Sequence, residues 1–309
     1  MATNIFIDGK DGTTGLRIFD RLADRADVNL ITLEESRRKD PAARQECIHA
    51  ADVAILCLPD AAARESVALA QGSKARILDT STAHRTAEGW AYGFPELSSE
   101  HRDGIVHGRH VAVPGCHASG FIALVAPLVR AGLVDASAQL SCFSITGYSG
   151  GGKKMIAEYE GEGRSPLLDA PRQYGLSQQH KHLPEMAAVS GLSAPPCFCP
   201  IVADFYSGME VSVPLFASQI KGTPAQIREI YREVYAGLVV RYVESPDEGG
   251  FLSAAALSGS DGMEISVSGN DERILLTARY DNLGKGASGA AIQNLNLLLG
   301  ADETEGLVL

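Results

Sequence analysis

The stretch NIFIDGKDGTTG, residues 4–15, decides the fold class of this 309-residue chain. Its apolar run at residues 4–8 predicts a β-strand, and Gly9, Gly12 and Gly15 follow where a helix is predicted to begin. Glycines at such a turn let the backbone approach a pyrophosphate, and a helix N-terminus supplies N–H groups and the positive end of a dipole. We interpret the stretch as a dinucleotide-binding loop, with Thr13 and Thr14 at the start of the helix.

The spacing of this loop keeps a second interpretation open. It is GxxGxxG rather than the commoner GxGxxG, so an ordinary glycine-rich turn competes with the nucleotide loop. A Walker loop is excluded, because Lys10 precedes the second glycine and no Gly-Lys-Ser/Thr sequence follows.

The first third of the chain alternates apolar, β-branched runs with helical segments. Further strands are predicted at residues 28–33, 53–58, 77–79 and 111–113, and helices at residues 16–23, 44–50 and 62–70. Strands that alternate with helices form βαβ units and a parallel, doubly wound sheet. The sequence therefore predicts an α/β, Rossmann-like nucleotide-binding domain over residues 1–115.

The pattern changes after about residue 140. Longer strands with hairpin-like connections are predicted at residues 139–146, 209–215, 237–242, 263–270 and 273–280, and a helix at residues 223–235. This pattern predicts a second domain of the α+β class with a mixed or antiparallel sheet, over residues 116–280. Apolar residues at helical spacing predict a closing helix at residues 288–299.

Charged residues follow the second predicted strand. An acidic residue, Glu34 or Glu35, would suit a ribose hydroxyl, whereas Ser36, Arg37 and Arg38 would suit a 2′-phosphate. A solvated charge run is the alternative. We favour the phosphate interpretation and therefore NADP(H) as the cofactor.

A cysteine lies where a helix is predicted to begin. Cys116 follows Pro114 and Gly115 and precedes the apolar run at residues 121–129. The helix dipole favours a thiolate there, as covalent acyl transfer requires. A core cysteine is the competing interpretation, which we accept for Cys47, Cys57 and Cys142.

Two histidines, His180 and His182, lie in a polar segment on no clear apolar face. A core histidine is therefore less expected here than usual, and no carboxylate is spaced to complete a zinc site. A general acid/base partner for the Cys116 thiolate is the better interpretation.

Two further segments are candidates for anion binding. Ser81 and Arg85 follow the strand at residues 77–79, and ligands bind at the carboxyl ends of strands in open α/β sheets. We assign Ser81 to the cofactor and Arg85 to the substrate, with a surface arginine as the alternative. Gly150 and Lys153 lie in a glycine-rich segment that could offer backbone N–H groups and a cation to a phosphate. The competing interpretation is a flexible loop with a solvated lysine.

Charge and cysteine usage exclude several classes of partner. The net charge of -11 argues against nucleic acid and anionic membranes, which need a basic surface. The longest apolar stretch is far too short to span a bilayer. The six cysteines have neither a disulfide-scaffold nor a zinc spacing, so we expect no metal and a cytoplasmic location.

In combination, these motifs resemble the N-acetyl-γ-glutamyl-phosphate reductase family in its shorter form and, more distantly, aspartate-semialdehyde dehydrogenases. The matching blocks span nearly the whole chain in the right order: residues 9–16, 78–85, 92–97, 114–120, 147–153, 180–185, 281–289 and 293–296. One departure is His117-Ala118, where many family members have an aromatic residue and proline.

The resemblance implies a role for individual residues. Cys116 would be the nucleophile, His182 the acid/base, Arg85 a holder of the acyl phosphate and Asn282 a neighbour of the nicotinamide. We assign the other histidine, His180, to substrate binding. Residues 281–309 would return to pack on the nucleotide domain, and the second domain would also serve to form a homo-oligomer. The implied reaction is NADPH-dependent reduction of an acyl phosphate to an aldehyde through a thioester.

Three alternatives stay open at this point. An aspartyl phosphate or an aminoadipate homologue would change the substrate and keep the chemistry. A cofactor-free cysteine hydrolase or acyltransferase would use Cys116 and His182 alone, which the nucleotide loop argues against. A silent nucleotide-binding protein is disfavoured by the presence of both residues.

Overall fold

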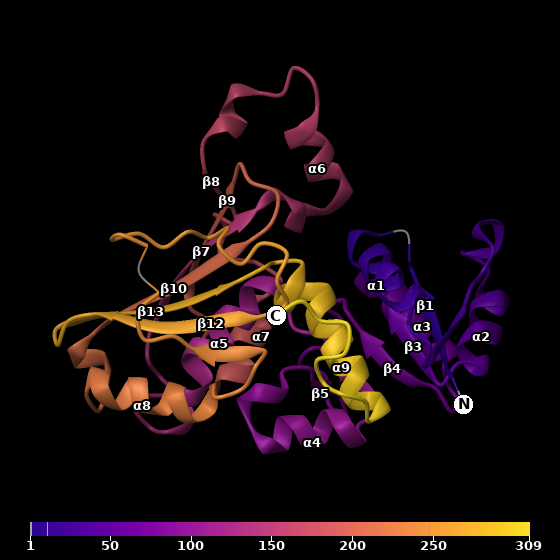
Figure 1. Ribbon diagram of the computed structural model, residues 1–309, viewed down its shortest axis with the longest axis horizontal. Helices are drawn as coiled ribbons and strands as arrows, with labels where there is room; N and C mark the ends of the chain where they lie inside the picture. The colour runs from indigo at the N-terminus through magenta and orange to yellow at the C-terminus, as the bar shows by residue number, and fades with distance from the viewer. Residues whose placement is uncertain (1, 11, 247) are drawn as a thin grey trace. The chain divides into compact units, whose positions relative to one another are not determined.

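The computed structural model describes residues 2–10, 12–246 and 248–309, and the chain forms two compact units. Unit 1 comprises the residues up to Pro95 together with Glu100–Pro114 and Ala290–Gly306. Unit 2 comprises Glu96–Ser99, Gly115–Gly289 and Leu307–Leu309. Each unit is built on its own β-sheet (Figure 1).

Unit 1 contains a six-stranded sheet in the order β2-β1-β3-β4-β6-β5, and its paired strands are parallel. Its strands are β1 (Thr3–Asp8), β2 (Val28–Ile31), β3 (Val53–Leu56), β4 (Arg76–Asp79), β5 (Ala91–Tyr92) and β6 (His110–Ala112). Every residue of β3 is buried, as expected for a strand covered on both faces. The predicted parallel, doubly wound sheet is confirmed.

Helices connect these strands, as the alternating pattern predicted. They are α1 (Thr13–Ala23), α2 (Pro41–Ala50) and α3 (Asp60–Leu69). The unit also contains α4 (Ser99–His107), which was not predicted, and the predicted closing helix α9 (Gly289–Leu299). Asp40 caps α2 by accepting hydrogen bonds from the amides of Ala42 and Ala43, at 3.0 and 3.4 Å. Figure 1 shows α1, α2 and α3 around β1, β3 and β4.

Helix α9 is bonded to the rest of unit 1 by polar groups. The Asn294 side chain donates to the Gly93 carbonyl at 2.8 Å, and Arg76 Nη1 donates to the Leu298 carbonyl at 2.6 Å. Both interactions involve buried or half-buried groups. The sheet of unit 1 therefore depends on a segment far along the chain, since Gly93 and Asn294 are separated by 201 positions.

Unit 2 contains a seven-stranded mixed sheet in the order β11-β12-β13-β10-β7-β9-β8. Its strands are β7 (Ser141–Gly147), β8 (Arg172–Gln173), β9 (Cys197–Ala203), β10 (Met209–Phe216), β11 (Val240–Tyr242), β12 (Met263–Gly269) and β13 (Arg273–Tyr280). The pairs β7–β9 and β11–β12 are parallel and the others antiparallel. The predicted mixed sheet is confirmed.

The helices of unit 2 are α5 (Cys116–Arg130), α6 (Gly152–Glu160), α7 (Leu183–Ser190) and α8 (Pro224–Val234). Short helical turns complete the chain: η1 (Glu35–Arg37) in unit 1, then η2 (Pro95–Leu97), η3 (Tyr148–Gly151), η4 (Pro166–Asp169), η5 (Ala217–Gln219) and the π-helical η6 (Gly284–Ser288). Helix α5 is buried from His117 to Leu128 and packs on β10 and β13. It is the central helix of the unit.

Several expected elements differ from those in the structure. The strand expected at residues 237–242 is confined to Val240–Tyr242, because Ala236 pairs with Arg241 across a turn that leaves Leu238 exposed. The glycine-rich segment expected as a loop instead continues from η3 into α6. Strand β9 and helices α4 and α7 were not predicted.

The face of the second sheet opposite α5 carries apolar side chains. Val211 and Val213 point to α5 and are fully buried, so their neighbours along β10 point the other way. On that opposite face Phe143 and Phe216 are 44% and 62% exposed. We call the surface formed by Phe143, Pro214, Leu275 and Phe216 the open face.

Candidate active site

Two of the three loop glycines are required by packing inside unit 1. Gly9 has a φ of +88°, and a Cβ there would lie 2.5 Å from the Cys57 carbonyl oxygen. A Cβ on Gly15 would lie 2.5 Å from the Gly9 carbonyl oxygen. Neither position accepts a side chain without displacing backbone.

Gly12 differs from its two neighbours. A Cβ there would have its nearest neighbour at 3.7 Å, so packing within unit 1 does not require glycine. Gly12 is also the N-cap of α1, and no side chain among the described residues caps that helix. Thr13 and Thr14 form its first turn, whose N–H groups suit an anion. The bare backbone at Gly12 therefore fits close approach by a pyrophosphate.

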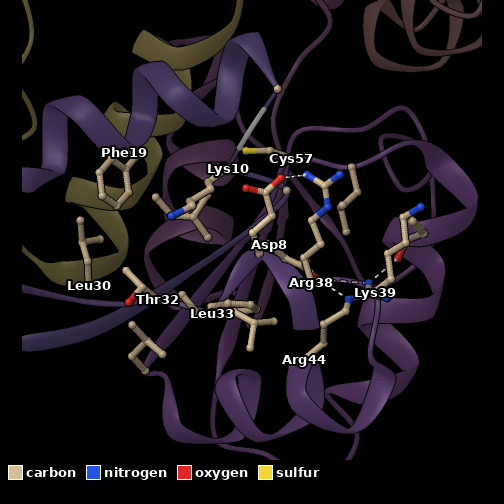
Figure 2. A pocket seen from close by; sticks show the side chains of 18 of the residues that line it. Asp8, Lys10, Phe19, Leu30, Thr32, Leu33, Arg38, Lys39, Arg44 and Cys57 are labelled. Atoms are coloured by element: carbon tan, nitrogen blue, oxygen red, sulfur yellow. Dashed lines mark hydrogen bonds and ion pairs between the residues drawn. The ribbon is translucent and has the colours of Figure 1, made fainter.

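A pocket of 630 Å³ lies against this loop, within unit 1 (Figure 2). Its walls come from the glycine loop, from the end of β2 and from the segment after β3. The carboxyl ends of parallel strands are where doubly wound sheets bind nucleotides. The size and place of the pocket suit part of a dinucleotide.

The cations of this pocket are of two kinds. Arg44 is buried, and its guanidinium is bonded to Asp8 Oδ2 at 3.1 Å and to Glu65 Oε2 at 2.6 Å. Burial opposes the charge of Arg44, but the hydrogen bonds and charges of Glu65 and Asp8 outweigh it and raise its pKa. Two carboxylates thus neutralise Arg44, which serves to fix the pocket wall.

Arg38 and Lys39 also line the pocket, and they are more accessible. Arg38 forms a surface ion pair with Glu35 at 3.2 Å, which solvent weakens. Arg37 instead pairs with Asp40 at 3.5 Å, and neither it nor Ser36 is among the described residues of the pocket wall. Of the three residues predicted to hold a 2′-phosphate, Arg38 is the one beside the pocket. The sequence interpretation missed Lys39, its neighbour in the same charge run.

Ser81 and Arg85 lie after β4 in a dense polar network. Asp79 is fully buried and accepts hydrogen bonds from the amide and hydroxyl of Ser81 and from His84 Nδ1. Arg85 donates to the carbonyls of Val113 and Thr80, at 2.9 and 3.1 Å, and so links the ends of β6 and β4. The roles of Ser81 with the cofactor and of Arg85 with the substrate stay predictions.

Cys116 is the first residue of α5, as the sequence predicted. Tyr280 Oη donates to the Cys116 carbonyl at 2.6 Å and accepts from the Gly120 amide at 3.0 Å, which fixes the first turn of the helix. Glu185 Oε2 accepts a hydrogen bond from the Gly115 amide at 3.2 Å. A Cβ on Gly286 would lie 3.1 Å from Cys116 Cβ, so the η6 backbone passes directly beside the thiol-bearing residue.

Cys116 is partly exposed at a helix N-terminus, whereas Cys142 is buried and Cys57 lies in the wall of the unit 1 pocket. Burial raises the pKa of Cys57 to about 12. Burial also holds the pKa of Cys142 well above its usual range. Both are therefore thiols at neutral pH. The core interpretation agrees with the structure for Cys142 but not for Cys57, which is partly exposed in the pocket wall. The dipole of the 15-residue α5 favours a thiolate at Cys116.

The structure brings His180 and His182 together close to the start of α5. Their ring centroids are 4.7 Å apart, and both rings approach His117, at 5.8 and 5.7 Å. Burial and the charge of Lys181 lower the pKa of His180. The expectation that these histidines avoid the core is wrong for His182, which is 4% exposed, because α7 begins at the next residue and packs on α5.

His117 was missed as a site residue. Its only signal in the sequence is its place directly after Cys116. Tyr174, whose hydroxyl is 2.6 Å from His117 Nε2, was missed as well, since nothing in its polar surroundings marks it.

Asn282 and the glycine-rich segment also come together in unit 2. The Asn282 side chain donates to Ser149 Oγ at 3.0 Å and accepts from the Gly208 amide at 2.9 Å. A Cβ on Gly150 would lie 3.4 Å from Asn282 Nδ2, and Lys153 is exposed in the first turn of α6. Asn282 thus fixes the segment that carries the proposed phosphate ligands.

Two kinds of feature are absent from the described residues. Residues 2–10, 12–246 and 248–309 contain no cluster of His, Cys, Asp or Glu side chains that could hold a metal ion. Within the same ranges, no helix has the length and apolar character that crossing a membrane requires.

Comparison with known proteins identifies both parts of the chain. Residues 4–105 match the family "Semialdehyde dehydrogenase, NAD binding domain", and residues 116–282 match "Semialdehyde dehydrogenase, dimerisation domain". The fold is also similar to that of aspartate semialdehyde dehydrogenase II from Vibrio cholerae, with a TM-score of 0.72, 15% identity and coverage of 97% of this chain and 99% of the other. A Candida albicans aspartate semialdehyde dehydrogenase solved with NADP gives a TM-score of 0.64 at 13% identity, with coverage of 97% and 99%.

The sequence relatives are much more similar. N-acetyl-gamma-glutamyl-phosphate reductase 2 of Nostoc sp. is 44% identical, with 98% of each chain covered. N-acetyl-gamma-glutamyl-phosphate reductase of Brucella ovis is 46% identical, with 97% of this chain and 100% of the relative covered. Identity at this level over full length confirms the resemblance. The chain is therefore an oxidoreductase with a nicotinamide-nucleotide-binding domain, and it belongs to the N-acetyl-γ-glutamyl-phosphate reductase family of semialdehyde dehydrogenases.

Proposed function

We propose that the protein reduces N-acetyl-γ-glutamyl phosphate to N-acetyl-glutamate semialdehyde with NADPH, in arginine synthesis. The observation that carries the proposal is 44–46% identity, over 97–98% of this chain, to reductases named for that substrate. The partly exposed Cys116 at the start of α5, beside His180 and His182, supports it. All six cysteines are free, which suits a reducing cytoplasm.

In this proposal the residues of unit 1 hold the cofactor. Gly9, Gly12 and Gly15 let the backbone meet the pyrophosphate at the start of α1, and residues 1–115 with 281–309 act as the nucleotide-binding domain. Arg38 and Lys39, which line the pocket, receive the 2′-phosphate, whereas Ser36 and Arg37, predicted for the same role, do not lie in its described wall. We therefore assign NADP(H) as the preferred form.

The cofactor assignment predicts an unequal effect of two substitutions. Arg38→Ala combined with Lys39→Ala should weaken NADPH binding about 10²- to 10⁴-fold, because each charged hydrogen bond to a phosphate contributes about 1.5–3 kcal/mol and the double variant removes two. NADH binding should change little, since NADH has no 2′-phosphate. Fluorescence titration with both cofactors measures the effect. Arg37→Ala is the matched control; equal losses for NADPH and NADH in the double variant would remove the assignment.

The chemistry belongs to residues of unit 2. In this proposal residues 116–280 act as the catalytic domain. The Cys116 thiolate adds to the acyl-phosphate carbonyl, the bond from carbon to the phosphate oxygen breaks, and a thioester forms. When bound, NADPH supplies the hydride that reduces this thioester. His182 protonates the resulting oxygen and takes the proton back as the carbon–sulfur bond breaks, which releases the aldehyde and restores the thiolate.

Other residues bind the substrate in this proposal. Lys153 and the Gly150 backbone contact the phosphate, Arg85 holds the acyl phosphate, and His180 contacts the substrate near the thiolate. Asn282 acts by holding Ser149 and so the glycine-rich segment, in addition to its predicted place near the nicotinamide.

We also propose that the protein is a homodimer and that the open face of unit 2 is the interface. The matching family is a dimerisation domain, and it covers every strand of this sheet. The open face presents Phe143, Pro214, Leu275 and Phe216, a set of apolar side chains that water would otherwise cover. A second copy of the same face would bury them.

Phe143→Asp should therefore convert the dimer to a monomer, because a carboxylate would be buried without a partner. Sedimentation velocity measures the change. Phe251→Asp, at a side chain that is 76% exposed outside the open face, is the control and should leave the dimer intact. A dimer that survives Phe143→Asp would place the interface elsewhere.

The substrate is tested by the reverse reaction with a panel of semialdehydes. We expect NADP⁺- and phosphate-dependent oxidation of N-acetyl-glutamate semialdehyde to exceed that of aspartate semialdehyde and of the aminoadipate homologue. A preference for either of the latter would change the substrate and keep the chemistry. Acyl-phosphate hydrolysis without any response of NADPH fluorescence would replace the proposal by a cofactor-free cysteine hydrolase or acyltransferase.

A further inference from the structure

His117 is the second residue of α5 and has both ring nitrogens in hydrogen bonds. Nδ1 is 2.7 Å from Ser144 Oγ on β7, and Nε2 is 2.6 Å from the Tyr174 hydroxyl, which follows β8. The ring is only 3% exposed, and Ser144 is fully buried. The reaction proposed above uses neither His117 nor Tyr174.

The protonation state of His117 follows from its surroundings. Burial, together with the charges of His180 and Lys181, lowers the pKa of His117 to about 3. The ring is therefore neutral at physiological pH and carries one N–H group, so one nitrogen donates and the other accepts. Ser144 is fully buried, and Nδ1 is the hydrogen-bond partner that the described residues offer its hydroxyl, so Ser144 donates to Nδ1 and Nε2–H donates to the Tyr174 oxygen.

This arrangement leaves the phenolic proton of Tyr174 available to another acceptor. Burial and the negative charge of Cys116 raise the pKa of Tyr174, so its hydroxyl stays protonated. Its bond to His117 places the hydroxyl beside the residue that follows Cys116. Two contacts fix Tyr174. Its side chain packs against the cluster of Tyr159, Leu168 and Val202, and its backbone amide donates to the Pro200 carbonyl at 3.0 Å. The hydroxyl is thus held at one place near the start of α5.

We propose that His117 is a positioning residue that holds the Tyr174 hydroxyl as a hydrogen-bond donor to the acyl oxygen of the substrate at Cys116. The inference rests on the proposed function for the identity of that substrate, and it adds a donor to the reaction. Ser144 fixes the ring by donating to Nδ1, and His117 fixes the phenol by donating to its oxygen. No proton is transferred along the hydrogen bonds from Ser144 through His117 to Tyr174, because Ser144 could not recover a proton that it gave up.

Substitution of His117 by glutamine or by asparagine tests its two hydrogen bonds separately. The amide nitrogen of a glutamine reaches the place of Nε2 and can bond Tyr174, whereas an asparagine reaches only the place of Nδ1 and can bond Ser144. We expect His117→Asn to lower kcat about 10-fold, the size of one hydrogen bond, and His117→Gln to restore most of the loss. NADPH affinity should stay unchanged in both variants.

A double-mutant cycle provides the decisive measurement. Tyr174→Phe alone should match the loss of His117→Asn, and the double variant should lose no more than either single variant, because both remove the same donor. A structural role of His117 would instead multiply the two losses and make Gln and Asn equivalent. Either result would overturn the inference. Thermal melting identifies variants that are merely unfolded; should His117→Asn unfold, Tyr174→Phe with Ser144→Ala replaces it in the cycle.

A second readout separates this inference from the substrate assignment. Acylation of Cys116 by p-nitrophenyl acetate, followed as a burst of p-nitrophenol, needs neither the native substrate nor the cofactor. The same pattern of losses in that burst supports the positioning role even if every semialdehyde of the panel is inert. A burst that is equal in wild type, His117→Asn and Tyr174→Phe would contradict it, whatever the panel shows.

Discussion

Cys116→Ser should abolish aldehyde formation, with a loss of at least about 10³-fold in turnover, because a serine hydroxyl at neutral pH does not replace a thiolate. The variant retains the size of the side chain, and the first turn of α5 is held by backbone bonds from Tyr280 that the change leaves in place. NADPH binding, which the proposal assigns to unit 1, should stay nearly intact. Stopped-flow measurement of NADPH consumption and fluorescence titration give the two readouts.

The matched control is Cys197→Ser, at a free and exposed cysteine on β9. It should retain full activity. Substantial turnover by Cys116→Ser would disprove covalent catalysis at this position, and a parallel loss of NADPH binding would indicate a damaged fold instead.

His182→Asn should lower turnover by about 10²- to 10⁴-fold, the usual contribution of a general acid. An imidazole that exchanges a proton with the substrate contributes one limb to the pH profile, so this limb should disappear in the variant. His182 is buried beside the start of α7, and asparagine fits the space without adding charge.

His180→Asn is the comparison for that measurement. Its effect should be milder and fall mainly on KM, because His180 is assigned to substrate binding and its lowered pKa keeps the ring neutral at physiological pH. If His180→Asn loses the pH limb and His182→Asn keeps it, the two roles are exchanged. If both variants keep it, Glu185, which lies against Gly115, is the next candidate.

The sequence predicts the regular strands well. The run at residues 273–280 matches β13 at both ends, and the run at residues 4–8 matches β1 to within one residue. Such runs are apolar on a face or throughout and end at turn residues, so local pattern is sufficient. Strand β9 escaped notice because Pro200 argues against a strand, and its parallel pairing with β7 along its whole length is a tertiary feature.

The candidate site was predictable where a motif combines local structure with chemistry. Cys116 is such a case, because Pro-Gly-Cys before an apolar run predicts both a helix start and a nucleophile. His117 and Tyr174 are the opposite case, since 57 positions separate them and only the packing of α5 on the sheet gives either one a partner. Lys39 and Arg37 are equivalent in the sequence, and only the turn η1 decides which of them reaches the pocket.

The order of the segments along the chain has a consequence for synthesis on the ribosome. Unit 1 includes Ala290–Gly306, and the carbonyl of Gly93 obtains its bond from Asn294 only once that segment has emerged. Unit 2 includes Leu307–Leu309, where the Val308 carbonyl accepts from the Asp261 amide at 2.6 Å and the Val308 amide donates to Asp261 Oδ2 at 2.9 Å. Neither unit can therefore complete its fold before residues 290–309 have emerged. The nascent chain must until then carry two unfinished cores, and a product that stalls or terminates earlier would leave both of them exposed to aggregation and proteolysis.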